Sequence, residues 1–341
     1  MTEPKQRPTI YRVGVVGAGA WGSALASLCS RAGHEVTLWG RDPAMIEGIN
    51  ARHENRRYLP GIQLDPALRA TAAMTELASC EICLLAVPAQ ALRAVAEQLA
   101  KAIGTAVPVV LCAKGIEATS GLLMTEVAAQ ALPGRPLAVL SGPTFAAEVA
   151  RGLPTAVTLA SRDIELAQRL TEALGTRSFR PYVSDDPLGA EIAGAVKNVL
   201  AIACGIVAGR RLGDNARAAL VTRGLAEMSR LALARGGKAE TLMGLAGLGD
   251  LTLTCTAAQS RNYSLGVALG EGQGLETALA AARGVVEGRF SAAATLAMAG
   301  RLDVEMPICA AVDAVVNRGA DLERTIAGLL GRPFKAEGFS A

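Results

Sequence analysis

The stretch RVGVVGAGAWGSALASLCSRAGHEVTLW, residues 12–39, decides the fold. A short β-rich run leads into a glycine-rich turn, a helical pattern follows and closes at Gly33, and a second β-rich run begins at residue 35. The pattern GxGxxG alone is a weak signal. Strand, glycine turn, helix and second strand in this order predict a βαβ unit that binds a dinucleotide.

Each glycine of the turn has a separate role in such a unit. Gly17 permits the tight turn after the strand, Gly19 lets the backbone approach a pyrophosphate, and Gly22 lets the helix pack close to the sheet. The amides at the helix N-terminus then face the anion. We therefore expect the pyrophosphate of a dinucleotide cofactor beside residues 17–22.

The pattern outside this unit divides the chain into two parts. Further near-continuous apolar runs, typical of strands covered on both faces, occur at residues 82–87, 108–113, 137–141 and 156–160. They predict a doubly wound α/β domain of Rossmann type over residues 10–186. After residue 186 the apolar residues recur at helical spacing, which predicts an all-α domain over residues 187–331.

The composition is that of a soluble protein. Of the 341 residues 51% are hydrophobic and the net charge is only +3, so neither disorder nor nucleic-acid binding is expected. Residues 192–208 form the longest apolar stretch, but Lys197 and Asn198 interrupt it, so we expect a buried helix and no membrane insertion. The polar N-terminus has no signal-peptide core, and the cytoplasm is the expected location.

The seven cysteines lie mostly inside apolar stretches, as reduced core thiols do. Cys80 and Cys83 form a single CxxC pattern. A zinc site needs two more suitably spaced ligands, and a redox site needs a thioredoxin-like context. We therefore expect buried thiols and no metal site.

The end of the second β-rich run bears on the choice of cofactor. An NAD-binding unit usually carries an acidic residue there to hold the ribose hydroxyls, whereas this chain has Trp39-Gly40-Arg41-Asp42. An arginine in place of the acid suits a 2′-phosphate, so we expect NADP(H) in preference to NAD(H). Two alternatives stay open: Asp42 holds the ribose from a shifted position, or Arg41 is an ordinary surface residue.

Hydride transfer to a carbonyl also needs a proton donor. Both histidines, His34 and His53, lie in turn or loop segments and suit surface positions better than a general base. Only six of the 34 Lys and Arg residues are lysines, and two have apolar surroundings, Lys114 in VVLCAKGIEA and Lys197 in AGAVKNVLAIA. Apolar surroundings lower the pKa of a lysine toward neutrality, so both are candidates. We place Lys197 one turn into its helix, from which it could alternatively extend to solvent.

Two further polar features lie in the predicted all-α part. Asp250 is the sole acidic residue of a long glycine-rich apolar run, and it can pair with a lysine and orient it. Ser260, Arg261 and Asn262 precede a helical pattern, so that Ser260 can cap the helix while the first amides and Arg261 face an anion. We expect a phosphate site there; the alternative is an ordinary helix start with a surface arginine.

Together these segments resemble one family, the bacterial NAD(P)-dependent glycerol-3-phosphate dehydrogenases. The resemblance covers the chain apart from its two tails. It is carried by GAGAWGSALA at 17–26, NRRYLPG at 55–61, AVPAQALR at 86–93, AKGIE at 113–117, LSGPTFAAEVA at 140–150, KNVLAIACGIVAG at 197–209, TRGLAEMSRL at 222–231, GLAGLGDL at 244–251, SRN at 260–262, VVEG at 285–288 and MPI at 306–308.

The resemblance implies that a homodimer reversibly reduces dihydroxyacetone phosphate to sn-glycerol 3-phosphate with NAD(P)H, feeding glycerophospholipid synthesis. It also implies that Lys197 exchanges the proton at the C2 oxygen, with Lys114 and Asp250 around the same centre. The implied substrate residues are Lys114, Gly142, Thr144, Lys197, Asp250, Ser260, Arg261 and Asn262. Beside Gly17, Gly19 and Gly22 of the turn, the cofactor residues that the resemblance implies are Ala20, Trp21, Arg41, Lys114, Ala146, Arg261, Val285 and Glu287.

The chain departs from the family pattern in two places, and two rival functions stay open. Ala20 and Thr144 stand where bacterial members often have serine; Ala20 can contribute only its backbone amide, while Thr144 keeps a hydroxyl.

A β-hydroxyacid or 6-phosphogluconate type dehydrogenase also uses lysine before asparagine, but it favours a carboxylate, and the segment from GLGDL to SRN distinguishes it. A non-catalytic nucleotide sensor is disfavoured by the two lysines, Asp250 and the SRN segment.

Overall fold

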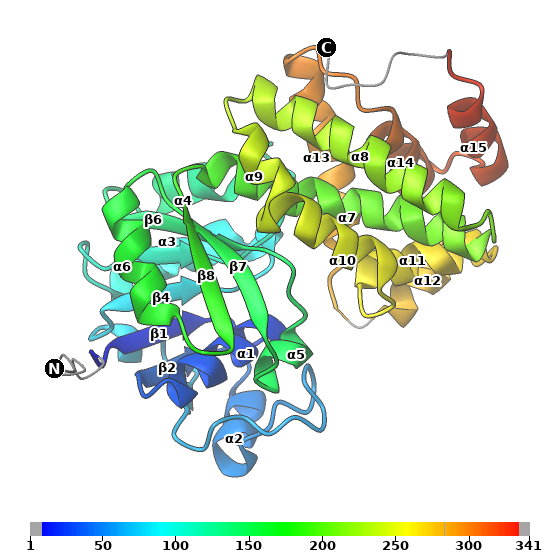
Figure 1. Cartoon of the computed structure of the whole chain (residues 1–341). Coiled ribbons are helices and arrows are strands. Elements are labelled where there is room, and N and C mark those ends of the chain that lie inside the picture. The colour runs from blue at the N-terminus through cyan, green and yellow to red at the C-terminus, as the bar shows by residue number, and fades with distance from the viewer. Residues whose placement is uncertain (1–8, 283, 334–341) are drawn as a thin grey trace, which may run out of the picture.

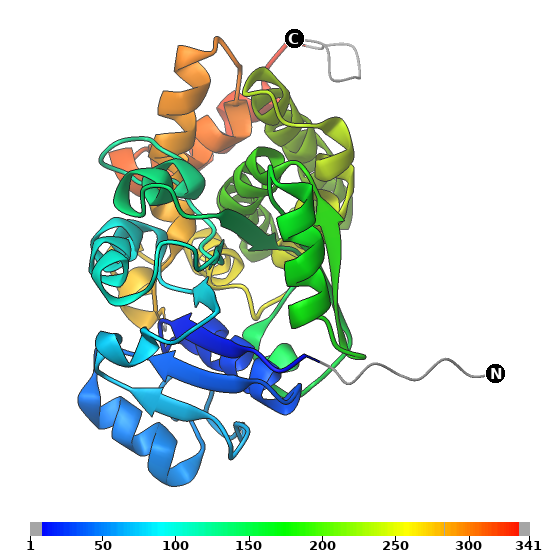
Figure 2. The ribbon, with the colours of Figure 1, turned by 90° about the vertical axis from the view of Figure 1, so that its left-hand side faces the viewer.

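The computed structural model describes residues 9–282 and 284–333. A sheet covered by helices forms one half of the molecule and a group of helices forms the other (lower left and upper right in Figure 1). The view turned by 90° places β1 and β2 at one end and the orange helices at the other (Figure 2). All strands of the described residues end by Ser184, and only helices follow from Pro187. The predicted fold class, a Rossmann-type domain followed by an all-helical domain, is confirmed.

One eight-stranded sheet has the order β3-β2-β1-β4-β5-β6-β7-β8. The strands from β1 to β6 are parallel to their neighbours, β7 is antiparallel to β6, and β8 is parallel to β7. The strands are β1 (Arg12–Val16), β2 (Glu35–Trp39), β3 (Arg69–Thr71), β4 (Ile82–Leu85), β5 (Val109–Leu111), β6 (Leu137–Ser141), β7 (Thr155–Ala160) and β8 (Phe179–Ser184). The sequence did not predict β3 and β8, because both are edge strands and neither is a continuous apolar run.

Helices pack on the sheet, and the first of them begins at the glycine turn. A Cβ atom on Gly22 would lie 1.8 Å from the carbonyl oxygen of Gly17, so only glycine allows this approach. The helices of this half are α1 (Ala20–Arg31), α2 (Pro43–Arg52), α3 (Leu92–Ala102), α4 (Met124–Ala131), α5 (Ala146–Ala150) and α6 (Ile164–Leu174), with the 3₁₀ turns η1 (Met74–Leu77) and η2 (Ala89–Ala91).

The second half is built around one long apolar helix, α7. Among the described residues α7 alone is long and apolar enough to cross a membrane, but 89% of its apolar window is buried inside the protein, so it is a core helix. The helices of this half are α7 (Pro187–Gly209), α8 (Asp214–Ala234), α9 (Ala239–Met243), the π-helical turn η3 (Leu245–Gly249), α10 (Asp250–Thr256), α11 (Arg261–Gly270), α12 (Leu275–Ala281), α13 (Glu287–Arg301), α14 (Pro307–Arg318) and α15 (Leu322–Leu330).

Glycines bring α7 and α11 into backbone contact. A Cβ atom on Gly205 would lie 2.1 Å from the Tyr263 carbonyl oxygen, and one on Gly266 would lie 2.0 Å from that of Ile202. Larger side chains at these positions would separate the helices. The close contact brings the first turn of α11 beside the middle of α7, where the candidate site lies.

Candidate active site

Lys197 is buried in the middle of α7. The helix begins at Pro187 and is capped by Asp186, so the expectation that Lys197 lies one turn from the helix start is wrong. The signal for this start was available in the sequence, because residues 183–188 carry turn residues and an acid pair typical of a helix start. Lys197 is 6% exposed, and its Nζ atom lies 2.7 Å from Asp250 Oδ1. The side chain therefore does not extend to solvent.

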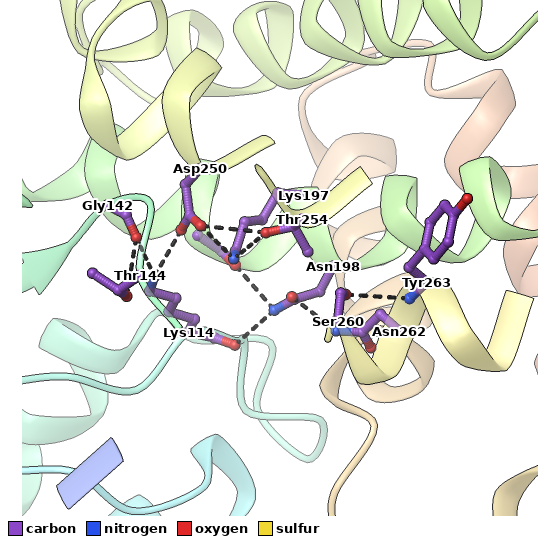
Figure 3. A network of polar contacts seen from close by, with 11 residues as sticks. Lys114, Gly142, Thr144, Lys197, Asn198, Asp250, Thr254, Ser260, Asn262 and Tyr263 are labelled. Atoms are coloured by element: carbon purple, nitrogen blue, oxygen red, sulfur yellow. Dashed lines mark hydrogen bonds and ion pairs between the residues drawn. The ribbon is translucent and has the colours of Figure 1, made fainter. Parts of the chain in front are cut away.

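Asp250 joins the two candidate lysines. It is the first residue of α10 and is 0% exposed. Its Oδ2 atom lies 2.7 Å from the Nζ atom of Lys114, which follows β5 and also donates to the Gly142 carbonyl oxygen at 2.9 Å. Thr144 donates to the same carbonyl at 3.3 Å. Figure 3 shows both lysines pointing toward Asp250, so the site combines residues of both halves.

Burial sets the protonation of Lys197. The pKa of Lys197 is lowered to about 8, chiefly because burial removes solvent from the ammonium; the carboxylate of Asp250 opposes this shift and the positive charge of Lys114 adds to it. At neutral pH the ammonium form therefore still predominates, yet it releases a proton far more readily than a lysine in water does. This is the property required of an acid/base residue near physiological pH.

Thr254 belongs to the site although the sequence reasoning missed it. Its hydroxyl lies 2.8 Å from Lys197 Nζ and 3.3 Å from Asp250 Oδ1. Thr254 follows Asp250 by four residues, so both side chains lie on one face of α10. This helical spacing was the available signal, but η3 and the start of α10 could not be recognised in the glycine-rich sequence.

Two asparagines connect α7 with the start of α11. The Asn198 amide donates to the carbonyl oxygens of Gly194 at 3.1 Å and Lys114 at 3.3 Å. Asn262 donates to Asn198 Oδ1 at 2.9 Å and accepts from the Gly288 amide at 2.9 Å. The network therefore ties Lys114, α7, α11 and the first turn of α13 together (Figure 3).

The three residues of the expected phosphate site surround one helix end. Ser260 caps α11 by accepting from the Tyr263 amide at 3.2 Å, as the sequence predicted. Arg261 is exposed, and a Cβ atom on Gly284 would lie 2.7 Å from its Nη1 atom. Asn262 is buried in the asparagine network. A guanidinium and a helix N-terminus thus lie together beside the asparagine network, an arrangement suited to a phosphate.

The glycine turn has the form that a pyrophosphate requires. Gly17 has φ of +113°, and a Cβ atom there would lie 2.5 Å from the Ala86 carbonyl oxygen. Gly19 precedes α1 without a side-chain cap, and a Cβ atom on it would meet nothing within 4 Å. Ala20 and Trp21 begin α1, and the buried Trp21 Nε1 has no partner among the described residues. The uncapped amides at the start of α1 and the unpaired Trp21 N–H are donors that suit a dinucleotide.

Asn55 holds this turn in place and was also missed. It is fully buried, and its amide donates to the Ala18 carbonyl oxygen at 2.9 Å and to Ser23 Oγ at 2.8 Å. Its Oδ1 atom accepts from the Tyr58 amide at 3.2 Å. Asn55 lies in the segment NRRYLPG, but nothing in that segment reveals contacts with residues more than thirty positions earlier.

The helical half also reaches toward the cofactor turn. Glu287 begins α13, and its Oε1 atom accepts from the Ala89 amide at 3.1 Å, close after β4. Its buried Oε2 atom has no partner among the described residues, and burial raises the pKa of this carboxyl. Val285 is exposed just before it, and Ala146 begins α5 at the sheet.

Of the two residues that follow Gly40 after β2, Arg41 has no partner in the described part of the chain, whereas Asp42 caps a helix. Arg41 is exposed and forms no hydrogen bond or ion pair with the described part of the chain. Asp42 caps α2 by accepting from the amides of Ala44 at 3.1 Å and Met45 at 3.3 Å, and Arg57 lies 3.6 Å from its Oδ2 atom. One carboxylate oxygen of Asp42 is occupied by the cap, which argues against binding of the ribose hydroxyls by Asp42.

All seven cysteines are buried and unpaired, as expected. Over residues 9–282 and 284–333 no group of three or more His, Cys, Asp or Glu side chains could hold a metal ion. Neither histidine joins the lysine cluster: His34 contacts the Tyr11 amide at 3.3 Å and the Ala173 carbonyl oxygen at 2.7 Å, and His53 is the C-cap residue of α2.

Comparisons with known proteins show which family this chain resembles. The profile described as the NAD-dependent glycerol-3-phosphate dehydrogenase N-terminus matches residues 12–167, and its C-terminus counterpart matches residues 186–327. The glycerol-3-phosphate dehydrogenase [NAD(P)+] of Parvibaculum lavamentivorans is 55% identical, covering 96% of this chain and 98% of its own. That of Rhodospirillum rubrum is 56% identical, with coverage of 97% and 95%. The crystal structure of glycerol-3-phosphate dehydrogenase from Coxiella burnetii superposes with a TM-score of 0.91 at 41% identity, covering 95% and 99%.

Proposed function

The chain belongs to the NAD(P)-dependent glycerol-3-phosphate dehydrogenases, and we propose that it reduces dihydroxyacetone phosphate by hydride addition at C2 with Lys197 as general acid. Its activity is that of a glycerol-3-phosphate dehydrogenase [NAD(P)+]. One observation carries the assignment of the proton: Lys197 is buried, its pKa is lowered, and its ammonium is held beside that of Lys114 by one carboxylate.

The residues around the glycine turn would hold the cofactor, which supplies the hydride when bound. The backbone at Gly17, Gly19 and Gly22 and the first amides of α1 would face the pyrophosphate. Arg41 would pair with a 2′-phosphate, which supports NADP(H) in preference to NAD(H). The remaining cofactor residues would be Ala20, Trp21, Lys114, Ala146, Arg261, Val285 and Glu287.

The substrate phosphate would lie at the N-terminus of α11. A dianionic phosphate needs charge-assisted donors, and Arg261 with the first amides of α11 supplies them beside Ser260 and Asn262. Gly142 and Thr144 would line the pocket next to Lys114. The carbonyl carbon of the substrate would then lie near the two lysines.

Lys197 has one N–H left for the substrate. An ammonium carries three, and the contacts with Asp250 and Thr254 use two of them. During reduction the third proton moves to the C2 oxygen, and Lys114 contributes a second positive charge near the developing alkoxide. In the reverse direction neutral Lys197 takes the proton from the C2 hydroxyl, and Asp250 stabilises the ammonium that forms.

Several broader assignments accompany this mechanism. We place the cofactor domain at residues 10–186 and the substrate domain at residues 187–331. The product, sn-glycerol 3-phosphate, would feed glycerophospholipid synthesis, and the enzyme would be a cytoplasmic homodimer. The buried position of α7 supports a soluble enzyme.

A kinetic comparison tests the proposal. The wild type should oxidise NADPH with dihydroxyacetone phosphate, and Lys197→Ala should lower kcat by about 10²–10⁴-fold because the general acid is lost. Lys101→Ala is the matched control, since Lys101 is exposed on α3. Turnover of hydroxyacid-type or sugar-acid substrates without turnover of dihydroxyacetone phosphate would refute the substrate. Normal turnover by Lys197→Ala would refute the proton relay.

A further inference from the structure

Besides Asp250 on α10, a buried carboxyl on α7 contacts the other half of the molecule. Glu191 lies six residues before Lys197 and is 3% exposed. Its Oε1 atom accepts from the Thr125 amide at 2.7 Å, and its Oε2 atom accepts from the Thr125 hydroxyl at 2.6 Å. Both carboxyl oxygens therefore bind one residue, the second of helix α4.

We propose that Glu191 is a positioning residue, which fixes the segment carrying Lys114 against the helix carrying Lys197. The proposal rests on the proposed function, because it assumes that both lysines act on one substrate. Glu191 and Lys197 share α7, about 9 Å apart along the axis at 1.5 Å per residue. A change at Glu191 would move Lys114 relative to Lys197 without touching either.

The segment between Lys114 and Thr125 is folded firmly enough to transmit such a displacement. Ile116 pairs with Leu123 in an antiparallel bridge, and the Glu117 amide donates to the Leu122 carbonyl oxygen at 3.0 Å. Ile116 and Leu123 are fully buried in the same core cluster as the residues of α7. The segment therefore behaves as one unit, held to α7 by packing and by Glu191.

The hydrogen bonds of Glu191 fix the orientation of α4 relative to α7, which apolar packing alone does not. The first amides of a helix have no partner within the helix, and α4 has no polar N-cap side chain because Leu123 occupies that position. Glu191 supplies an acceptor to one of these amides from the other half of the molecule. An apolar side chain of similar size would fill the space but would fix neither the distance nor the rotation of α4.

Arg235, the residue that follows α8, adds a second contact at the same place. It lies 2.6 Å from the carboxylate of Glu126 on α4. This pair is partly exposed, so it contributes little energy by itself. At the first turn of α4 the sheet half thus meets both Glu191 of α7 and Arg235, and Glu191 makes the buried contact.

The chain offers a matched control in Glu227. It is 2% exposed on α8 and accepts from the amides of Ile308 at 2.7 Å and Cys309 at 3.2 Å, at the start of α14. Like Glu191, it is a buried glutamate that caps another helix. Both helices of the Glu227 contact belong to the helical half, and neither carries a residue of the site.

The test compares kcat and cofactor affinity in Glu191→Ala, Glu191→Gln and Glu227→Ala. Glu191→Ala should lower kcat with dihydroxyacetone phosphate about tenfold, because small displacements of reacting groups are costly. The Kd for NADPH, measured by fluorescence, should change less than about twofold, because Glu191 bonds to Thr125, and Lys114 is one of many proposed cofactor residues. Glu191→Gln keeps an acceptor for the amide and gains a donor for the hydroxyl, so it should restore kcat to within about twofold. Glu227→Ala should lose thermal stability and keep its kcat.

An unchanged kcat in Glu191→Ala, or an equal loss in Glu227→Ala, would overturn the positioning role while leaving the proposed function intact. Failure of the wild type to reduce dihydroxyacetone phosphate would instead refute the proposed function. If Glu191→Ala does not fold, Thr125→Val removes only the hydroxyl contact and Thr125→Ser retains it. Lower kcat in Thr125→Val than in Thr125→Ser would support the inference, and equal kcat would overturn it.

Discussion

The Nζ atoms of Lys114 and Lys197 both lie 2.7 Å from Asp250, each on a different oxygen of its carboxylate. The two ammonium groups and one carboxylate leave the cluster with one net positive charge. That charge comes from both halves of the molecule, since Lys114 follows β5 and Lys197 lies on α7. A buried site with this balance favours a substrate oxygen that becomes negative during the reaction.

Replacing Asp250 by Asn should reduce activity and shift its pH dependence. The carboxylate raises the pKa of Lys197, so its removal should move that pKa below about 8. We expect kcat/KM to fall about 10²–10³-fold, because Lys197 loses both its charge partner and its orientation. Rates measured across pH 6 to 9, with the exposed Asp185→Asn as control, check this. A wild-type pH profile in Asp250→Asn would contradict the role of Asp250.

The two directions of the reaction should respond to pH in opposite ways. In the proposed mechanism reduction requires protonated Lys197, so its kcat/KM should be full below the lowered pKa and decline as the pH rises through about 8. Oxidation of glycerol 3-phosphate requires the neutral amine and should be lost as the pH falls through about 8. Steady-state profiles of both directions test this. Parallel profiles would show that another group titrates.

The sequence predicted the parts of the fold that depend on local pattern. The glycine turn, the apolar strands and the cap at Ser260 each depend on neighbouring residues, so they could be predicted from short segments. The edge strand Phe179–Ser184 has largely exposed side chains and lacks the apolar signal of a covered strand.

The site was harder to predict than the fold, because its members come from distant segments. Lys114 and Asp250 are 136 residues apart in sequence, and Asn55 reaches the glycine turn across 37 and 32 residues. The scarcity of lysine and histidine drew attention to Lys114 and Lys197. Thr and Asn residues are common, so Thr254 and Asn55 could be recognised only from their contacts.

Replacing Arg41 by Ala should change cofactor preference rather than general activity. Arg41 is exposed and free to pair with a 2′-phosphate, a group that NADPH has and NADH lacks. We expect kcat/KM with NADPH to fall about tenfold or more while that with NADH changes little, as for the loss of a charge-assisted contact. The exposed Arg177→Ala serves as control. Equal losses with both cofactors would refute the 2′-phosphate role.

Replacing Gly266 by Ala should destabilise the helical half. The new Cβ atom would lie 2.0 Å from the Ile202 carbonyl oxygen and 2.9 Å from the Gly205 Cα atom, so α11 would have to move away from α7. We expect the free energy of unfolding to fall by about 3 kcal/mol or more, as for severe overpacking. Asn262 lies on the displaced helix, so the KM for dihydroxyacetone phosphate should rise as well.

Gly300→Ala is the control for that substitution, because Gly300 lies on α13 with open space around its Cβ position. There the added methyl group should stabilise the helix by about 0.5 kcal/mol, since alanine loses less backbone entropy than glycine. Chemical denaturation of both variants measures the difference. Equal stability of Gly266→Ala and the wild type would mean that α7 and α11 do not need their close backbone contact, and that Asn262 is held beside Asn198 by its side-chain hydrogen bonds instead.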